Sequence, residues 1–465
     1  MNRARILVPL GLSVLLAGCA GSLPDVALKP PLLPSYRAAN TAARPTDRAW
    51  WKNFGDPVLA GLVERALAGS PDVAAAAARI DQARAAAKAA GAARFPSGAV
   101  NGSAARAEQS IDSGIGRLTR FVPTLDRTQD QALLSASLGW DLDLAGGLRR
   151  SQQAALADAA AARAGLETAR LAVAAEVTDN YLSYRAAQAQ LAVAEARQKR
   201  LADRLHFADV RLRLQEASLR DRDGSAAALA AASSAAPLWR AQADAARFAL
   251  AVLTGEPAGT ALPELDGAGP IPLAGDPAAG VPADLLRARP DLVVAEAQVL
   301  AAHARVGAAL GEYWPHVTLT GLIGFDTNTL STFGAPTSRV TQGAVGLRWR
   351  LFDFARVDAE VRAARGRERE VLENYRAAVL KAGAQVESGF ALLAARRAAL
   401  ESEEARLAAT SDSFGRAKAA RRLGEISEDQ LRGAELERIE AQASAFAARL
   451  ALAQALLACH KALGG

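Results

Sequence analysis

The chain of 465 residues contains one pattern twice, and this internal repeat restricts its fold to two similar halves. Pro71-Asp72 opens an Ala-rich stretch that ends at Phe95-Pro96, and Pro290-Asp291 opens another that ends at Trp314-Pro315. The prolines are 25 residues apart in both stretches (96 − 71 and 315 − 290). Beyond these stretches, the matching landmarks lie 209 residues apart: Trp140 and Trp349, Val177 and Val386, Tyr181 and Phe390, and Arg213-Leu214 and Arg422-Leu423.

Each half predicts a helix followed by two strands. The helices are expected over about 57–94 and 283–313. Apolar and polar residues alternate through residues 134–143, 317–325 and 345–351, and more weakly through 97–107. Such alternation is typical of a strand with one buried face. The chain therefore predicts four strands, two from each half.

Very long helices are expected after the strands, because no proline occurs between Pro123 and Pro237 or after Pro336. Residues that step by three or four predict a coiled-coil-like seam in both halves. These residues are Val173, Val177, Tyr181, Tyr184, Gln188 and Leu191 in the first half, and Ala382, Val386, Phe390, Leu393, Arg397 and Leu400 in the second.

Turns and links separate the long helices. Gln215 and the matching Gly424 mark turns into return helices, and Pro237 is expected to disturb the first return helix. Residues 255–282 are rich in Gly and Pro and read as the link between the two halves.

The N-terminus reads as an export signal with a lipid attachment site. Arg3 and Arg5 precede an apolar run that is too short to span a bilayer. Residues 16–19, Leu-Ala-Gly-Cys, resemble the bacterial lipoprotein cleavage motif, with Cys19 as the residue that carries the lipid. Ala20 favours the outer membrane over retention at the inner membrane. Residues 19–48, with five prolines, predict an extended tether.

Composition and motifs argue against an enzyme and against a nucleic-acid-binding protein. The net charge is +6, but the cations are interleaved with acids as on a solvated helix surface. The sequence contains no Gly-rich phosphate loop, no nucleophile elbow and no clustered metal ligands. We therefore expect no catalytic residues, no cofactor and no metal site.

Four amphipathic strands cannot form a closed barrel by themselves. An open sheet edge in a bilayer leaves backbone groups unsatisfied, at a cost of several kcal/mol each. Membrane barrels begin at about eight strands. Several chains are therefore expected to share one barrel, although the residues alone do not give their number.

The sequence resembles the TolC-like outer membrane factors, in particular the lipoprotein branch that serves resistance-nodulation-division multidrug pumps. The resemblance covers nearly the whole mature chain. It is carried by Pro282, Leu285, Leu286, Arg287, Arg289, Pro290, Asp291, Ala295 and Glu296, by Ala249–Pro257, by Trp140–Leu144 with Gly147–Arg150, and by Ala462–Gly465.

This resemblance implies a mixed α and β fold that is internally duplicated. A homotrimer would form a 12-stranded outer-membrane β-barrel, with four strands per chain. The barrel would continue as a long periplasmic α-helical coiled-coil barrel with a small equatorial domain. The expected parts are a signal peptide (1–18), a lipidated tether (19–48), a first efflux repeat (49–255), an inter-repeat link (256–282) and a second repeat (283–465).

The function implied by the resemblance is that of a passive exit duct in the outer membrane. Drugs or other small molecules would pass through it from the periplasm to the exterior. A periplasmic adaptor and an inner-membrane transporter of the resistance-nodulation-division type would be its partners. Two alternatives stay open: the exit duct of a type I protein secretion system, and a lipid-anchored periplasmic coiled-coil scaffold.

Charged residues beside the second turn are candidates for a periplasmic gate. Three copies of one acid around a narrow axis would repel each other, and a neighbouring arginine could hold the closed state. The alternative is that these acids are solvated first-turn residues, which are favourable at a helix N-terminus. The candidates are Glu425, Glu428, Asp429, Arg421 and Arg422.

The exposed turns are also candidate contacts for the adaptor. Their residues could instead serve helix-turn chemistry alone. The candidates are Arg213, Leu214 and Ser218 in the first half, and Leu423, Gly424 and Ser427 in the second. Trp140 and Trp349 could belong to an aromatic belt at the membrane interface or pack at the junction between barrel and helices.

Overall fold

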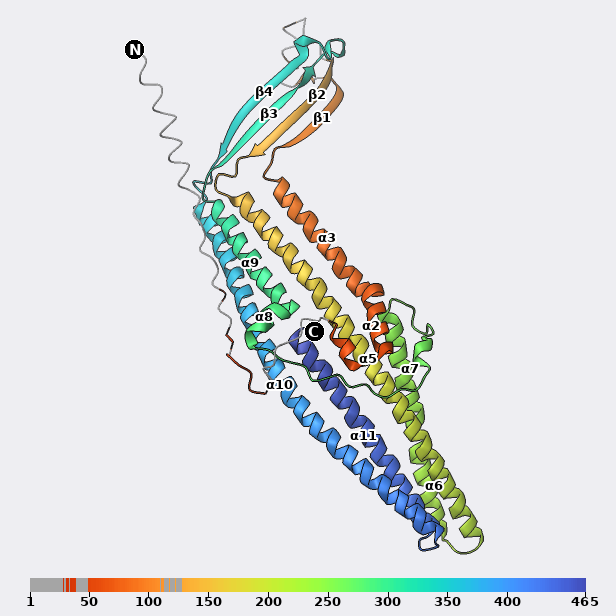
Figure 1. Ribbon diagram of the computed structural model, residues 1–465. Helices are drawn as coiled ribbons and strands as arrows, with labels where there is room; N and C mark the ends of the chain where they lie inside the picture. The colour runs from red at the N-terminus through yellow and green to blue at the C-terminus, as the bar shows by residue number, and fades with distance from the viewer. Residues whose placement is uncertain are drawn as a thin grey trace. The chain divides into compact units, whose positions relative to one another are not determined.

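The computed structural model describes residues 49–108, 110–112 and 128–465, and residues 28, 31–32, 34–38, 117 and 122 (Figure 1). The chain forms two compact units. The first, which we call the sheet unit, includes Asp81–Ala161 and Glu296–Asn374. The second, the helical unit, comprises Lys29–Ile80, Ala162–Ala295 and Tyr375–Gly465. The predicted lipid attachment residue, Cys19, lies outside the described residues.

The sheet unit contains one antiparallel sheet of four strands in the order β1-β2-β3-β4 (Figure 1). Its strands are β1 (Ser97–Glu108), β2 (Thr128–Asp141), β3 (His316–Thr327) and β4 (Arg339–Arg348). All four predicted strands are confirmed, including the weakest, β1. Strand β4 ends at Arg348, so Trp349 and Leu351, which were predicted to lie in this strand, lie beyond its end.

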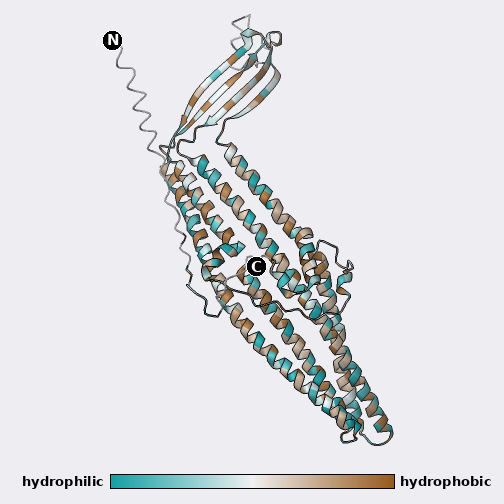
Figure 2. Ribbon diagram, viewed as in Figure 1, coloured by the Kyte–Doolittle hydropathy of each residue, from teal (hydrophilic) through white to brown (hydrophobic). Residues whose placement is uncertain are grey.

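The register of the strands separates an apolar from a polar face. Ile323 lies opposite Ala136 and Thr341, whereas the next residue back, Leu322, lies opposite Ser137 and Gln342. Because side chains alternate along a strand, paired residues share a face. The large exposed apolar residues of the strands all lie on the Ile323 face. They are Val100, Leu134, Leu138, Trp140, Ile323, Val345 and Leu347. Figure 2 shows the bands of apolar and polar residues along the strands.

Two unbroken helices follow the strands of the two halves. They are α5 (Gly147–Arg213), with 67 residues, and α10 (Phe354–Arg422), with 69. The predicted seam is buried at Val177, Tyr181, Val386 and Phe390, whereas Arg397 is exposed and pairs with Asp276. The long helices are thus confirmed, and their apolar stripes pack within the chain.

The return helices differ between the halves. The second is continuous, α11 (Glu428–Leu463), whereas the first is divided into α6 (Leu219–Ser233) and α7 (Ala235–Leu253). Ser234 separates the two segments, three residues before Pro237. The disturbance expected from Pro237 is therefore confirmed, since proline cannot donate the backbone hydrogen bond of a continuous helix.

The prediction of one continuous helix at the start of each half was wrong. The structure has α2 (Pro57–Gly69) and α3 (Pro71–Ala92) in the first half, and α8 (Leu285–Ala288) and α9 (Pro290–Gly311) in the second. Ser70 and Arg289, which separate them, have extended ψ angles of 128° and 114°. Both residues precede a proline, and proline disfavours the helical conformation in the residue before it.

Residues 256–282 contain the short 3₁₀ turn η2 (Pro263–Leu265), end at the first residue of a second one, η3 (Pro282–Asp284), and otherwise form turns and loops. They are fixed to α5 by polar contacts of the seam. The Tyr184 hydroxyl donates to the Leu265 carbonyl at 2.9 Å, and the buried Arg185 donates to the Gly267 carbonyl. Tyr181 donates to Asp56 at 2.6 Å, and burial together with this carboxylate raises the pKa of Tyr181 to about 12. Described residues of this equatorial part form helices and loops rather than strands.

The N-terminal segment packs on the helical unit where it is described. Tyr36 is buried, and the backbone N–H groups of Arg37 and Ala38 donate to the two carboxylate oxygens of Glu387 at 2.7 and 2.8 Å. Residues 34–38 of the predicted tether are therefore docked on α10.

A close backbone contact is repeated in both halves. Gly255, just after α7, and Gly464, just after α11, both have positive φ angles, +87° and +92°. A Cβ atom on Gly255 would lie 2.4 Å from the Gly69 carbonyl oxygen, and one on Gly464 would lie 2.6 Å from that of Ala288. The duplication therefore preserved the point at which each return helix ends against its first helix.

Replacement of Gly255 by Ala is expected to destabilise the helical unit strongly. The matched control is Gly259→Ala, because Gly259 has a similar φ of +94° but open space where a Cβ atom would lie. The control isolates left-handed strain, about 1–2 kcal/mol, whereas Gly255→Ala adds crowding of about 1–3 kcal/mol. Thermal unfolding of the detergent-solubilised protein measures both. Equal shifts in the two variants would contradict the close contact.

Candidate functional site

The two turns that join the long helices to their return helices have the same hydrogen bonds. Gln215 donates to the Leu212 carbonyl at 3.0 Å and Glu216 to that of Arg211 at 2.8 Å. In the second turn, Gly424 donates to Arg421 at 3.1 Å and Glu425 to Ala420 at 3.0 Å. This pair of bonds is a Schellman motif around a left-handed residue. Gln215 adopts the left-handed conformation with φ 60°, and Gly424 with φ 79°.

Two of the predicted contact residues, Ser218 and Ser427, begin the return helices as N-caps. The Ser218 hydroxyl accepts from the Asp221 N–H at 3.2 Å, and that of Ser427 accepts from the Gln430 N–H at 3.2 Å. The side chains of Asp221 and Gln430 accept from the cap residues in return. Both serines therefore have a local structural role, which is to cap the return helices.

The remaining predicted contact residues stand out from the turns. Leu214 is 63% exposed and its repeat partner Leu423 is 75% exposed. Arg213 and Arg422, the residues before them, are exposed as well. Each turn thus presents an Arg-Leu pair to its surroundings. Single exposed apolar residues are common on protein surfaces, so the contact role of these pairs stays a prediction.

The candidate gate acids differ in their surroundings. Glu428 lies 3.1 Å from Arg421 and 3.2 Å from Arg432, and Asp429 lies 3.4 Å from Arg204. The hydrogen bond from Arg421 holds the pKa of Glu428 below its usual value. Among the described residues, Glu425 has no ion pair, and neither has Arg422. Two of the three acids are thus neutralised by arginines of the same chain.

A set of contacts between the halves was missed by the sequence analysis. Arg200 of α5 pairs with Glu435 of α11 at 2.9 Å. Arg432 of α11 donates to the Asp203 carbonyl at 3.1 Å and lies over the Phe207 ring at 4.6 Å. These contacts and the Arg204–Asp429 pair join α5 to α11, and we call them the α5–α11 clasp. A signal existed in the spacing of three or four residues along both helices, but the sequence does not show which helices are neighbours.

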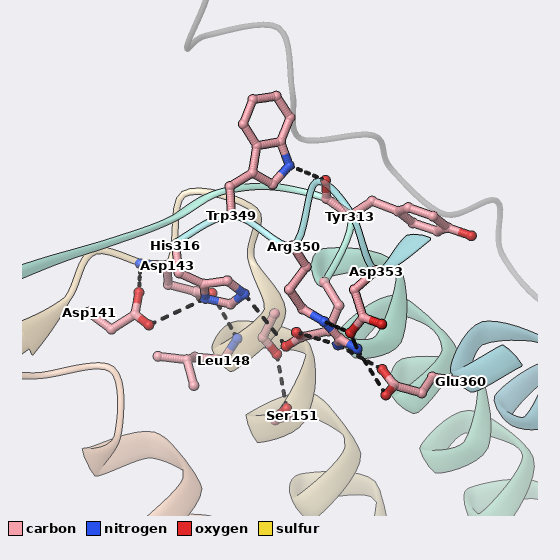
Figure 3. A network of polar contacts seen from close by, with 12 residues as sticks. Asp141, Asp143, Leu148, Ser151, Tyr313, His316, Trp349, Arg350, Asp353 and Glu360 are labelled. Carbon is pink, nitrogen blue, oxygen red and sulfur yellow. Dashed lines mark hydrogen bonds and ion pairs between the residues drawn. The ribbon is translucent and has the colours of Figure 1, made fainter. Parts of the chain in front are cut away.

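The junction between strands and helices in the sheet unit is held by matching tryptophans. The Trp140 indole N–H donates to the Arg94 carbonyl at 3.0 Å, and that of Trp349 donates to the Tyr313 carbonyl at 3.0 Å (Figure 3). Both rings stay partly exposed at the end of the apolar face. The indole nitrogens therefore serve the junction.

An ionic network lies at the same junction, in the second half only (Figure 3). Arg350 pairs with Glu312 at 3.1 Å, with Asp353 at 2.9 Å and with Glu360 at 2.9 Å. These contacts tie the end of α9 to the first turns of α10. Position 350 corresponds to Asp141 in the first half, so the repeat did not preserve this network.

His316, the first residue of β3, lies between two carboxylates (Figure 3). Its Nδ1 atom is 3.5 Å from Asp141 and its Nε2 atom is 3.5 Å from Glu312. Asp143, with a positive φ of 46°, accepts from the N–H groups of Leu148 and Arg149, each at 2.8 Å, and thereby caps α5. His316 and Asp143 thus contact other residues of the junction and the N-terminus of α5.

The titratable groups of the described residues give no sign of a metal centre or reactive thiol. No group of three or more His, Cys, Asp or Glu residues that could hold a metal occurs in the described part of the chain. Cys459 is fully buried, and burial raises the pKa of its thiol to about 11. A thiol of this kind is inert at neutral pH.

Comparison with known proteins identifies the family. The profile of the outer membrane efflux protein family matches residues 62–256 and 281–465. The chain belongs to this family. The two matched segments correspond to the two halves that carry the internal repeat.

Relatives and solved structures agree with this assignment. The pyoverdine export outer membrane protein OpmQ of Pseudomonas aeruginosa is 32% identical over 97% of this chain and 95% of its own length. The protein of the same name from Pseudomonas putida is 31% identical over 100% of this chain and 98% of its own. The structure of the outer-membrane channel OprN matches with a TM-score of 0.81 and 27% identity, covering 96% of this chain and 99% of the other.

These findings confirm the TolC-like duplicated fold and the function of an outer membrane efflux channel. The family is one of non-enzymatic channels located in the outer membrane. The turns, the clasp and the junction are therefore features of an outer membrane efflux channel.

The second turn is expected to lose protection in acid through Glu428. Its ionised form is stabilised in the folded state, so this contribution is present above its ordinary pKa of 4.5 and is lost as the pH falls through the lowered value. Hydrogen exchange of residues 416–436, corrected for intrinsic rates, measures it. Glu428→Gln should show reduced protection at pH 6 and no further acid-dependent loss, whereas Glu425→Gln should behave as wild type. An identical pH response in Glu428→Gln and wild type would contradict this role.

Proposed function

We propose that this efflux channel is a lipid-anchored homotrimer that forms the exit duct of a tripartite pump. The observation that carries the proposal is the apolar face of the four-stranded sheet. Val345 and Leu347 on this face are 72% and 67% exposed, and Val100 is 75% exposed. A water-exposed surface of this kind is unfavourable for a single chain, whereas contact with lipid satisfies it.

The two edge strands support the sharing of one barrel. In the described sheet β1 and β4 each pair on one side only, so their outer backbone groups lack strand partners. An open edge does not persist within a bilayer. Pairing of β4 with β1 of the next copy completes the ladder, and three copies give twelve strands, above the minimum of about eight for a membrane barrel. The polar face then lines a water-filled lumen.

Anchoring by lipid at Cys19 is the second part of the proposal. The signal at residues 1–18 would be removed, and the new N-terminus would carry the acyl chains. Support comes from the cleavage-like motif and from the docking of Arg37 and Ala38 on Glu387, which fixes the far end of the tether. The repeats at 49–255 and 283–465, with the link at 256–282, would form the channel body in the outer membrane and periplasm.

The exposed turns are proposed to dock a periplasmic adaptor, through which an inner-membrane transporter delivers cargo and energy. Leu214 and Leu423 offer apolar contacts, with Arg213 and Arg422 beside them. The cargo is proposed to be small molecules, since two relatives that match over nearly their whole length carry names of pyoverdine export proteins. No feature of the described structure favours protein secretion, and a periplasmic scaffold does not account for the apolar sheet.

The gate is proposed to involve the α5–α11 clasp together with the free charges of the second turn. Opening of the turns requires α11 to move away from α5, which breaks the Arg200–Glu435 and Arg204–Asp429 pairs. Glu425 and Arg422, which have no ion pair among the described residues, are left to face neighbouring copies or partners. Arg421 holds Glu428 and thereby stabilises the closed form of the turn.

A charged residue on the apolar face is expected to prevent barrel assembly. Ile323→Arg places a guanidinium toward lipid, at a cost of about 2–4 kcal/mol near the bilayer centre. Leu322→Arg, on the next residue, is the control because that side chain belongs to the polar face. Outer-membrane yield and heat-modifiable oligomer on gels should fall for the first variant only. Equal yield of both variants would count against the assigned faces.

A bulky residue at the second turn is expected to impair pump function without loss of the oligomer. A Cβ atom on Gly424 would meet no atom within 4 Å, so Gly424→Trp projects a ring outward. Gly424→Gln is the control, because Gln215 already adopts the left-handed conformation in the first turn. Rescue of drug resistance or export in a deletion strain should fail for Gly424→Trp and persist for Gly424→Gln. Full rescue by Gly424→Trp would remove the turn from the docking surface.

A further inference from the structure

The polar face of the sheet is almost free of charge along its described strands. Its residues are mainly Ser, Thr, Asn, Gln, Ala and Gly, and they line a shallow hollow of about 470 Å³ that includes Ser137, Thr320 and Gln342. The register places Asp326 at one end of this face, and Asp141, His316 and Arg348 at the end that adjoins the helices. Any electrostatic preference of this surface therefore arises near its two ends.

The other charges at the helix-proximal end are engaged in contacts within the chain. The Asp141 carboxylate accepts from the Asp143 N–H at 2.9 Å and lies 3.5 Å from His316, which is charged only if protonated. Arg350 is shared among Glu312, Asp353 and Glu360, and Arg356 also pairs with Glu360, so this network keeps a net charge of −1 (2 − 3).

Arg348 differs from these neighbours. It is exposed, lies directly opposite His316 in the ladder, and forms no ion pair with any residue in the described part of the chain. Strand β4 also begins with an arginine, Arg339, but Arg339 lies opposite Phe325 on the apolar face. The two arginines are nine residues apart (348 − 339), an odd number that places them on opposite faces.

We propose that Arg348 is a specificity-determining residue that shifts the charge preference of the helix-proximal mouth of the barrel lumen toward anionic small molecules. The inference rests on the proposed function, because the polar face must line a shared water-filled lumen. Three copies then place around one opening three guanidinium groups that form no ion pair in the described part of the chain. Fixed charge at the mouth of a water-filled channel with low-dielectric walls raises the local concentration of ions of opposite sign. Cargo with carboxylate, phosphate or sulfonate groups would benefit.

A cysteine reporter on the same face tests the local field directly. Ala344→Cys is suitable because Ala344 is exposed, small and on the polar face, opposite Thr320. It lies four residues from Arg348, about 13 Å along the strand. Buried Cys459 does not compete for reagent, and the parent without the reporter gives the background from Cys19. The anionic and cationic methanethiosulfonates of similar size are applied to the intact oligomer at about 0.01 M salt, where the screening length is about 30 Å.

The measured quantity is the ratio of the anionic to the cationic modification rate. Arg348→Gln should lower this ratio about two- to threefold, as expected for loss of one charge at this distance in water. Arg348→Glu should lower it further, and 0.5 M salt should abolish the difference. Arg339→Gln, on the same strand but the opposite face, should leave the ratio unchanged.

Two results would overturn the inference, and they are distinguishable. An unchanged ratio in Arg348→Gln, with a reporter that both reagents modify, removes Arg348 as a determinant but leaves the water-filled barrel intact. A reporter that neither reagent modifies in the intact oligomer, but both modify after denaturation, shows that the polar face is not lined by water. That second result contradicts the proposed function as well.

Discussion

The exposed apolar face of a sheet with two unpaired edges is the constraint on which the rest of the structure depends. Exposure of the apolar face to water is unfavourable, and so is exposure of the unpaired backbone groups of the sheet edges to lipid. The sheet of one chain alone is therefore unstable in either environment. Completion by other copies satisfies both requirements at once. In the proposed oligomer, the polar face lines a lumen through which cargo passes.

Some contacts of the structure occur in both halves of the repeat, and others occur in one half only. The Trp140 and Trp349 bonds, the Schellman turns, the capping boxes and the Gly255 and Gly464 contacts occur in both halves. The Arg350 network and the unpaired Arg348 occur in one half only, and the break near Pro237 divides only the first return helix. The shared contacts determine where helices and strands end. The charged residues that occur in one half only make the two halves chemically different. We expect residues with a specific function to be found among them.

Much of this fold was predictable because its signals are local in sequence. The register of the repeat, the alternation in the strands and the absence of prolines from α5 and α10 gave the order of elements and most of their bounds. The breaks at Ser70 and Arg289 were not predicted, because the Ala-rich helical pattern continues on both sides of them and only the following proline signals the break. The α5–α11 clasp was missed for another reason. Arg200 and Glu435 are far apart in sequence, and only the packed structure shows that their helices are neighbours. Likewise, whether Glu425, Glu428 and Arg348 form ion pairs depends on their neighbours in space, which no sequence motif specifies.

The central claim is that β4 of one copy pairs with β1 of the next, and site-directed disulfide formation tests it most directly. Each variant carries one cysteine on β1 and one on β4, and the two positions are moved along the strands from variant to variant. Disulfides between copies should form in the variants whose two positions match the register of the β4–β1 pair. Complete oxidation should produce covalent dimers and trimers and nothing larger, because three copies close the ring. A monomer that stays uncross-linked at every register, or a ladder that continues beyond three chains, would contradict the account.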